Sequence, residues 1–261
     1  MSLVANQVGA LIQGVAVLDG ISATFERNRI YGIIGPNGVG KSTLLHILSG
    51  SDAPSSGSVA LDGMPLTDMT GKPLARKLAV LQQGGLPPVG FTVREVVAMG
   101  RFPHQNWLGG EAEDPESIIA GAIDAMGLTG LQSRKLHQLS GGERQRVALA
   151  KLMAQQPEIL LLDEPTTYLD IGYQIELLDT VKAWQKRKEL LVIAVLHDLN
   201  LASLYCDKLI ALHKGRIAAE GAPEEVLQPA IIETLYGAKT TLVKHPATGV
   251  PQLILQPGTE V

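Results

Sequence analysis

The sequence contains only one cysteine, Cys206, among its 261 residues. A single thiol cannot form an internal disulfide, and it leaves no cysteine cluster that could bind a metal. We therefore expect Cys206 to be a buried, inert thiol. Basic residues are not in excess either, because the net charge is −4. The positive footprint that nucleic-acid binding normally needs is absent, so no nucleic-acid partner is expected.

Long apolar segments are absent as well. The longest uninterrupted apolar run covers residues 190–196, whereas a helix needs roughly 20 apolar residues to cross a bilayer. Residues 1–18 carry no charged side chain, so the basic start of a secretory signal is missing. We expect a cytoplasmic protein that another chain must bring to a membrane if it works there.

What the sequence does contain is enough apolar material for a full core. Hydrophobic residues make up 45% and charged residues 18% of the chain, as in ordinary globular proteins. Buried strands are predicted at residues 30–34, 159–162 and 190–196, and helices at residues 143–155 and 173–187. Continuous apolar strands that alternate with helices favour a mostly parallel sheet covered on both faces. The predicted fold class is therefore α/β.

Other segments are expected to add to this core. Residues 15–25 and 58–61 are predicted strands, and residues 93–99 and 115–126 are predicted helices with a loop at 100–113 between them. The predicted organisation is a single domain, 1–261, whose core consists of residues 1–83 and 139–239, with a helical subdomain at residues 84–138 and a strand pair at residues 240–261.

The most informative stretch lies between a predicted strand and a predicted helix. It matches the pattern G-x-x-x-x-G-K-[ST] of phosphate-binding loops in nucleotide hydrolases. Its glycines allow the backbone to turn tightly and to bring N–H groups against phosphate oxygens. Lys41 can place its charge on the β- and γ-phosphates, and the Ser42 hydroxyl can hold Mg²⁺. A glycine-rich turn that binds nothing is the alternative. The segment consists of Gly35, Pro36, Asn37, Gly38, Val39, Gly40, Lys41, Ser42 and Thr43.

Two carboxylates, Asp163 and Glu164, follow the apolar strand predicted at residues 159–162. Ligand sites in parallel sheets lie at the carboxyl ends of the strands. Asp163 could hold Mg²⁺ there, and Glu164 could orient and deprotonate a water that attacks a γ-phosphate. Without the phosphate-binding loop, an acidic start of the following helix would explain the pair as well.

A second possible anion site begins at Ser140, Gly141 and Gly142. This string at the start of a helix supplies exposed N–H groups and the positive end of a helix dipole. Ser140 and Glu143 also form the S-x-x-E pattern of a capping box. The two interpretations are compatible, because a capped helix start still presents N–H groups to a ligand.

In this order, the motifs resemble one family, the ATP-binding cassette (ABC) ATPases. The phosphate-binding loop is followed by the string Leu-Ser-Gly-Gly-Glu at residues 139–143 and then by the strand that ends in Asp163 and Glu164. The resemblance covers essentially the whole chain. It implies a P-loop NTPase core with a mostly parallel sheet, an antiparallel β portion and a helical subdomain. It also implies ATP as the nucleotide and Mg²⁺ as its partner.

The resemblance assigns roles to further residues. Gln83 matches the glutamine at the junction with the helical subdomain, and its neighbour Gln82 is the alternative. Tyr168 and Asp170 match a loop that contacts the other subunit, and His197 matches a histidine switch near the γ-phosphate. The implied catalytic residues are Lys41, Gln83, Glu164 and His197; the implied Mg²⁺ ligands are Ser42, Gln83 and Asp163; and the nucleotide is also contacted by Ser140, Gly141, Gly142 and Asp170.

One feature of the family is missing. Its members usually have an aromatic residue near the N-terminus that stacks on adenine, but no Phe, Tyr or Trp precedes Phe25. An aliphatic contact from Ile12 or Val17 would have to replace it. A preference for ATP over GTP therefore depends on the resemblance alone.

In this family one chain holds only half of each active site. The Ser-Gly-Gly segment of one subunit covers the ATP on the phosphate loop of the other, so we expect a head-to-tail homodimer that closes on two Mg·ATP. With one cassette and no predicted membrane segment, a separate ATPase subunit of an importer fits best. Its other partners would be integral membrane permease subunits and, indirectly, a substrate-binding protein. It would work at the cytoplasmic face of the membrane.

The transported cargo is suggested by further segments. Residues 91–104, residues 143–146 and two pieces of the tail, 235–237 and 246–249, are similar to ATPases of iron-siderophore, haem and vitamin B12 uptake. The segment near residues 84–104 would receive a helix of the permease. The alternatives are an ATPase for another cargo, such as amino acids or phosphate, and a soluble ABC ATPase outside transport. The last class usually has two cassettes or a long coiled-coil insertion, and this sequence shows neither.

Overall fold

The structure is a computed structural model that describes residues 1–257 except 70, 85, 107–109, 112–113 and 168. It divides into two compact units, which are described separately. The first unit consists of Met1–Asp68 and Leu191–Val261, and the second of Met69–Leu190. The limits of the helical subdomain, residues 84–138, stay a prediction.

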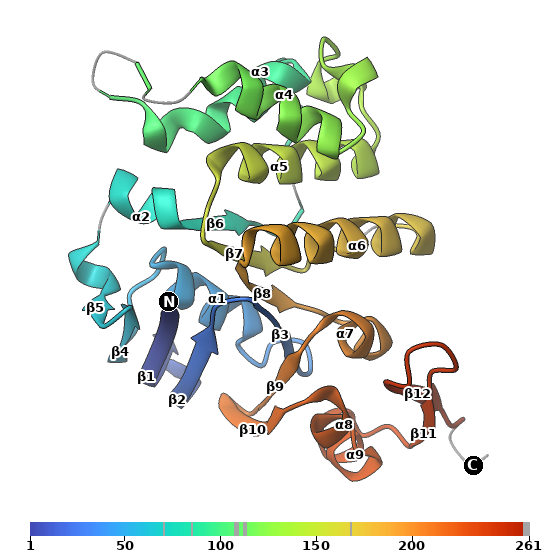
Figure 1. Cartoon of the computed structure of the whole chain (residues 1–261). Helices are drawn as coiled ribbons and strands as arrows, with labels where there is room; N and C mark the ends of the chain where they lie inside the picture. Colours follow the sequence, from blue (N-terminus) through green and yellow to red (C-terminus); the bar gives the residue numbers. More distant parts are fainter. Residues whose placement is uncertain (70, 85, 107–109, 112–113, 168, 258–261) are drawn as a thin grey trace. The chain divides into compact units, whose positions relative to one another are not determined.

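The first unit begins with an antiparallel sheet (Figure 1). Its strand order is β2-β1-β4-β5, and β1 pairs with both β2 and β4. Along β2 the buried side chains Ile21, Ala23 and Phe25 alternate with exposed ones, as expected when one face of a sheet covers a core. The strands are β1 Ser2–Ile12, β2 Val15–Glu26, β4 Ser56–Leu61 and β5 Met64–Pro65.

The same unit contains three parallel strands with β3 in the middle. β3 pairs with β8 on one side and with β9 on the other, and β10 lies antiparallel to β9. β8 is buried along its whole length, which explains its uninterrupted apolar sequence. Helix α1 follows β3 after the glycine-rich loop. The elements are β3 Arg29–Ile34, α1 Lys41–Ser49, β8 Leu191–Val195, β9 Lys208–His213 and β10 Arg216–Gly221.

Short helices and a strand pair complete the first unit. β11 and β12 pair antiparallel. Asn200 in α7 links this helix to β12 through hydrogen bonds with the backbone of Leu253. The elements are η1 Leu66–Asp68, α7 Leu199–Tyr205, α8 Pro223–Val226, α9 Pro229–Tyr236, β11 Thr240–Lys244 and β12 Pro251–Leu255.

The second unit combines two parallel strands with helices. β6 and β7 are parallel neighbours, and α3 and α4 pack on α5 (Figure 1). The elements are α2 Lys72–Lys77, β6 Leu78–Leu81, α3 Val93–Ala98, η2 Met99–His104, α4 Pro115–Ala125, η3 Thr129–Leu131, η4 Leu136–Gln138, α5 Gly141–Gln155, β7 Ile159–Asp163 and α6 Ile171–Lys188. Parallel strands, an antiparallel portion and a helical part confirm the predicted fold class.

One predicted loop is wrong in part. Residues 100–104 were expected within a loop, but the 3₁₀ helix η2 extends over Met99–His104. A Cβ atom at Gly100 would lie 2.2 Å from the carbonyl oxygen of Lys151 in α5. Glycine therefore lets this turn pack directly on a helix, so here it does not mark a loop. Residues 107–109 and 112–113 of the same predicted loop lie outside the described residues.

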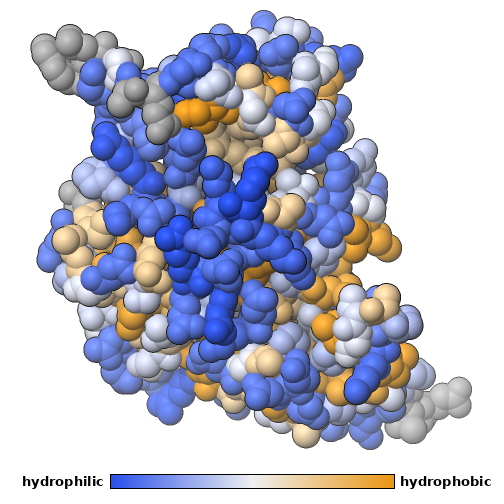
Figure 2. Space-filling model, in the orientation of Figure 1, coloured by the Kyte–Doolittle hydropathy of each residue, from blue (hydrophilic) through white to orange (hydrophobic). Residues whose placement is uncertain are grey.

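The remaining expectations concern burial and membranes. Cys206 is buried, as predicted. Within the residues that the structure describes, no helix combines the length and apolar character needed to cross a bilayer. Hydrophobic residues reach the surface among the C-terminal elements (Figure 2), where Val243, Ile254 and Leu255 are exposed.

Candidate active site

The phosphate loop connects β3 to α1 through backbone conformations that favour glycine. Gly40 is the N-cap of α1 with φ of 102°, and no side chain caps this helix. A Cβ atom at Gly40 would lie 2.7 Å from Leu18 and 3.0 Å from the carbonyl oxygen of Val17. The first N–H groups of α1 therefore have no side-chain acceptor at the N-cap, and they are placed for an anion.

Lys41 occupies the first position of α1 and is 5% exposed. Its ammonium group donates hydrogen bonds to the carbonyl oxygens of Gly35 at 2.8 Å and Pro36 at 2.9 Å. A buried ammonium at this place is well suited to an anionic ligand, because phosphate oxygens form strong, charge-assisted hydrogen bonds with it. The loop thus holds its cation beside the place where a phosphate would lie.

His197 lies at the same edge of the parallel strands as the phosphate loop. β8 is parallel to β3, with Val195 opposite Ile33, and the amide of Leu196 donates to the carbonyl oxygen of Ile33 at 3.2 Å. His197 follows immediately and is exposed. Since the carboxyl ends of adjacent parallel strands form the usual ligand site of such sheets, this position is compatible with the predicted histidine switch.

The two candidates for the adenine contact differ in position. Ile12 pairs with Val15 at the tip of the β1–β2 hairpin, where both are exposed. Val17 lies against the phosphate loop, because a Cβ at Gly40 would be 3.1 Å from its Cγ1 atom. Both side chains are aliphatic, so either would contact a base through dispersion and apolar burial without aromatic stacking.

Tyr236, the last residue of α9, was not predicted from the sequence to be part of the site. Burial raises the pKa of Tyr236 to about 12, while a hydrogen bond with the backbone of Gly35 acts in the opposite direction. A C-terminal tyrosine thus contacts the first residue of the phosphate loop. No local pattern could have revealed it, because the contact joins distant parts of the chain.

In the second unit, the carboxyl ends of β6 and β7 bring predicted site residues together. Asp163 ends β7 and is 3% exposed. The side-chain amide of Gln83, just after β6, donates to Oε2 of Glu164 at 2.7 Å. This contact favours Gln83 over Gln82 as the residue that reaches the site. Gln82 lines a different hollow, which it shares with Leu152.

Glu164 is held in a strained conformation. Its φ is 49°, in the left-handed region that non-glycine residues seldom adopt outside functional sites and turns. The hydroxyl of Thr167 donates to the same Oε2 atom at 3.1 Å. Thr167 was not singled out from the sequence, although it lies only three residues away. Two donors therefore orient one oxygen of the predicted catalytic carboxylate.

Helix α5 starts with the predicted capping box. Ser140 is the N-cap; its Oγ accepts from the amide of Glu143 at 3.2 Å, and its own amide donates to Oε2 of Glu143 at 2.7 Å. Hydrogen bonds that the Glu143 carboxylate accepts from the backbone and the side chain of Ser140 lower the pKa of Glu143. A Cβ at Gly141 would meet nothing within 4 Å, so this part of the helix start is open to a ligand. Helix α5 begins two residues earlier than expected, since Ser140 caps it.

Some of the predicted site residues of the second unit line the same hollow on its surface. Gly141 and Glu164 line one hollow together with Gly84, Arg144, Gln145, Thr167 and Leu169. Asp170 is the N-cap of α6 and is exposed. Tyr168 lies outside the described residues.

The predicted site residues fall into two groups. Residues 35–43 and His197 belong to the first unit, while Gln83, Ser140–Gly142, Asp163, Glu164 and Asp170 belong to the second. Among the described residues, no group of three His, Cys, Asp or Glu side chains could hold a metal by itself. Any Mg²⁺ would therefore need hydroxyl, amide or phosphate oxygens beside Asp163. The individual roles of these residues stay predictions.

Residues 18–167 match the protein family described as ABC transporter. The chain is 43% identical over 222 residues to the ferric enterobactin transport ATP-binding protein FepC of Escherichia coli, covering 85% of this chain and 82% of that protein. It is 39% identical to the probable siderophore transport system ATP-binding protein YusV of Bacillus subtilis, covering 97% and 93%.

Solved structures show the same fold. A metal-chelate type ABC transporter in an inward-facing conformation matches with a TM-score of 0.84 at 23% identity, covering 98% of this chain and 97% of that one. The dimeric ATP-binding cassette MJ0796 in a post-hydrolysis state with ADP and Pi matches with a TM-score of 0.74 at 26% identity, covering 85% and 98%. The chain therefore belongs to the ABC transporter family, as one of its ATP-binding, ATP-hydrolysing proteins.

Proposed function

We propose that this chain is the ATP-hydrolysing subunit of a membrane importer for a metal chelate, of the iron-siderophore, haem or cobalamin type. The observation that carries the ATPase part is the phosphate loop, in which an uncapped helix start and the buried ammonium of Lys41 lie at one strand edge. The cargo class is supported by the relatives, which are named for ferric enterobactin, siderophore, petrobactin and cobalamin transport.

The nucleotide would be held by groups whose chemistry suits a triphosphate. The N–H groups of residues 35–43 surround the phosphates, and Lys41 neutralises their charge. Ile12 or Val17 contacts the base. His197 donates a hydrogen bond toward the γ-phosphate. Together these contacts place the terminal phosphate at the carboxyl edge of β3 and β8.

Magnesium fits the donor set on this chain. Asp163 is a carboxylate that is almost completely buried, and Ser42 and Gln83 add a hydroxyl and an amide oxygen. Mg²⁺ prefers such oxygen ligands together with substrate phosphates. When bound, the ion neutralises the charge that develops on the phosphate oxygens.

Glu164 would act as the catalytic base. Gln83 and Thr167 both donate to its Oε2 atom, which fixes the orientation of the carboxylate. The carboxylate so oriented would accept a proton from a water that attacks the γ-phosphorus. The strained backbone at Glu164 is consistent with a side chain that is held for a reaction.

A complete site would need a second copy of the chain. The Ser140–Gly142 segment of one protomer would cover the ATP on the phosphate loop of its partner, with Asp170 at the contact between them. The similar cassette MJ0796, which is dimeric with ADP and Pi bound, supports the formation of a dimer. Closure on two ATP molecules and opening after hydrolysis would drive the transport cycle.

The importer would supply the remaining partners. Permease subunits would bind the segment near residues 84–104 and would hold this chain at the cytoplasmic face of the membrane. A substrate-binding protein would act on the permease from the other side. The names of relatives that are import ATP-binding proteins support this assignment.

Replacement of Glu164 by Gln tests the catalytic part. The variant keeps the shape of the side chain but cannot accept the proton, so ATP hydrolysis should fall by about 10²-fold or more, while ATP binding is retained. Phosphate release and nucleotide affinity should be measured on the same preparation. Hydrolysis at the wild-type rate would remove Glu164 from the role of base.

A further inference from the structure

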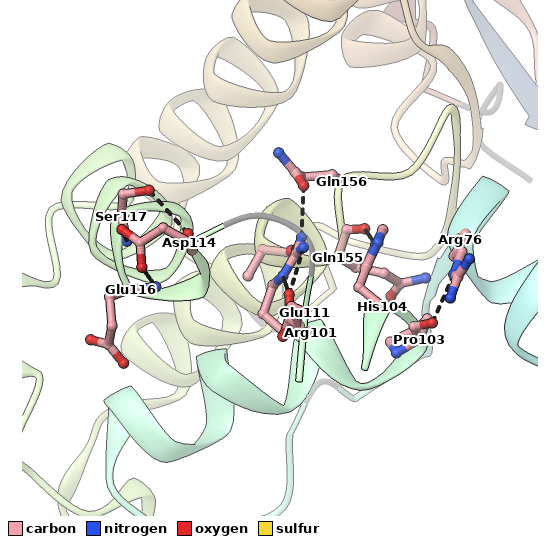
Figure 3. Close-up of polar contacts among 11 residues, drawn as sticks. Arg76, Arg101, Pro103, His104, Glu111, Asp114, Glu116, Ser117, Gln155 and Gln156 are labelled. Atoms are coloured by element: carbon pink, nitrogen blue, oxygen red, sulfur yellow. Dashed lines mark hydrogen bonds and ion pairs between the residues drawn. The ribbon is translucent and has the colours of Figure 1, made fainter. Parts of the chain in front are cut away.

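The C-terminal end of α5 is tied to η2 by side chains that the proposed function does not use. Among the residues that the structure describes, Arg101 in η2 is the largest of the fully buried side chains, with 2% exposure. Its NH1 atom donates to the carbonyl oxygen of Ala154 at 2.8 Å and to Oε1 of Gln156 at 2.7 Å. Both acceptors lie at the end of α5, and Figure 3 shows the guanidinium of Arg101 directed at Gln156. A guanidinium here satisfies carbonyl groups that a helix end leaves without partners, and it complements the negative end of the helix dipole.

A second residue of η2 acts on the same helix end. Nε2 of His104 lies 2.8 Å from the carbonyl oxygen of Gln155 (Figure 3), and this geometry requires the tautomer that carries a proton on Nε2. Gly100 lets the backbone of η2 approach Lys151 directly. The C-terminus of helix α5 is therefore held by side chains of η2 in addition to its own C-cap, Gln156.

Arg101 is itself held by a buried carboxylate. Its Nε and NH2 atoms both lie 2.9 Å from Oε2 of Glu111, whose side chain is 4% exposed. A buried ion pair of this kind seldom increases stability relative to apolar residues of similar volume. Its geometry instead fixes the guanidinium toward α5. The desolvation of these two charges costs free energy. A role in fixing the position of α5 would explain why the pair is nevertheless present.

The position of α5 matters because its opposite end carries Ser140, Gly141 and Gly142. Helix α5 has 15 residues, and a helix of this length spans about 22 Å. A rotation or shift at the C-terminus therefore moves the N-terminal segment, and small misplacements of a positioned group are costly.

We propose that Arg101 is a positioning residue for the Ser140–Gly142 segment: it anchors the far end of α5 on η2, so that the segment meets the partner's nucleotide in the correct orientation. This inference rests on the proposed ATP-dependent dimer. It also connects that dimer to the segment near residues 84–104, since η2 belongs to it. A permease bound there would act on α5 through Arg101 and His104.

The test measures two properties of one preparation: ATP affinity and ATP-dependent dimer formation. Both are measured in the Glu164→Gln background to prevent hydrolysis. The double variant Arg101→Met with Glu111→Leu removes the anchor without leaving a buried charge unpaired. It should form the dimer about tenfold less readily, while the ATP affinity of the monomer, measured at high dilution, stays within about twofold, since the phosphate loop is in the other unit.

The matched control removes another Arg–Glu pair from the same unit. Arg94 and Glu116 form an exposed hydrogen-bonded ion pair that does not involve the end of α5. Arg94→Met with Glu116→Leu should leave both properties unchanged. If the Arg101 and Glu111 double variant dimerises as well as this control, the inference is overturned.

A milder pair of variants decides the question if the double variant does not fold. Gln156 has φ of 54° and Glu189 has φ of 53°, and they are the C-caps of α5 and α6. Glycine adopts this conformation without strain. Gln156→Gly removes one anchor contact and should weaken dimer formation, whereas Glu189→Gly should not. Equal dimer formation by these two variants would contradict the role of Arg101 as an anchor of α5. A failure of the Glu164→Gln protein itself to dimerise would refute the proposed dimer, and the anchor with it.

Discussion

Two helix starts in this chain carry glycines and a possible anion site, yet they are built differently. Helix α1 begins at Gly40, which offers no side-chain cap, and Lys41 places a buried ammonium beside it. Helix α5 begins at Ser140 and has a complete capping box, in which Glu143 places a carboxylate on the helix start. The N-terminus of α1 therefore carries a cationic side chain, and the N-terminus of α5 carries an anionic one.

This difference indicates that the N-termini of α1 and α5 would interact with a nucleotide in different ways. A triphosphate gains both N–H donors and a positive charge at α1, so it can bind there first. At α5 it meets a serine hydroxyl and open glycine backbone, but also the charge of Glu143, whose pKa is lowered by its hydrogen bonds with Ser140. Repulsion by that charge makes α5 a poor primary phosphate site. It is suited to cover a nucleotide that another loop already holds.

Lys41→Ala should produce the largest effect. It removes the only ammonium that the described contacts place on the phosphate loop, and hydrogen bonds to a charged group contribute about 1.5–3 kcal/mol. ATP affinity should fall by roughly tenfold to a hundredfold, and dimer formation should be lost with it. Isothermal titration with ATP measures this. Unchanged affinity would show that α1 is not the primary site.

Ser140→Arg should separate the two helix starts. The long cationic side chain fills the space in front of α5 and breaks the capping box, while residues 35–43 stay intact. ATP affinity of the monomer should therefore remain within about twofold, since distant sites contribute independently, but the ATP-dependent dimer should disappear. Sedimentation velocity with and without ATP distinguishes these outcomes. A variant that still dimerises would contradict the role of α5 as a cover.

Glu143→Gln should have the smallest effect, and it depends on pH. The folded-state pKa of Glu143 lies below its ordinary value of 4.5. The charged capping contact therefore contributes to stability above pH 4.5, and the contribution is lost as pH falls through the folded-state pKa. Thermal unfolding should show a lower Tm than wild type at pH 7 and equal values at strongly acidic pH. A difference that persists in acid would mean that the charge is not responsible.

The site residues predicted from the sequence share one property: each belongs to a motif whose members are consecutive or only a few positions apart. The phosphate loop, the capping box of Ser140 with Glu143 and the buried end of β7 at Asp163 all follow from local spacing and periodicity. Their conformations are set by neighbours in sequence, such as an N-cap serine or a strand that ends in a carboxylate. The fold class followed from the same local alternation of strands and helices.

What could not be predicted depends on contacts between distant segments. Tyr236 reaches Gly35, and Arg101 reaches Ala154, only because the chain folds back on itself. The helices and strands at residues 199–239 were not predicted, because each of them is short. The 3₁₀ helix η2 was expected to be a loop since Gly100 and Pro103 usually interrupt regular structure; tertiary packing of Gly100 on α5 outweighs that tendency.

The central claim is that hydrolysis takes place between two copies of this chain. The specific ATPase rate of the purified wild-type protein, measured with Mg²⁺ over a wide range of protein concentrations, tests it most directly. The rate per chain should rise with concentration as dimers form, and Glu164→Gln should trap an ATP-bound dimer in sedimentation. The claim would be contradicted if the protein remained monomeric with ATP and its ATPase rate per chain stayed at the full value at every protein concentration.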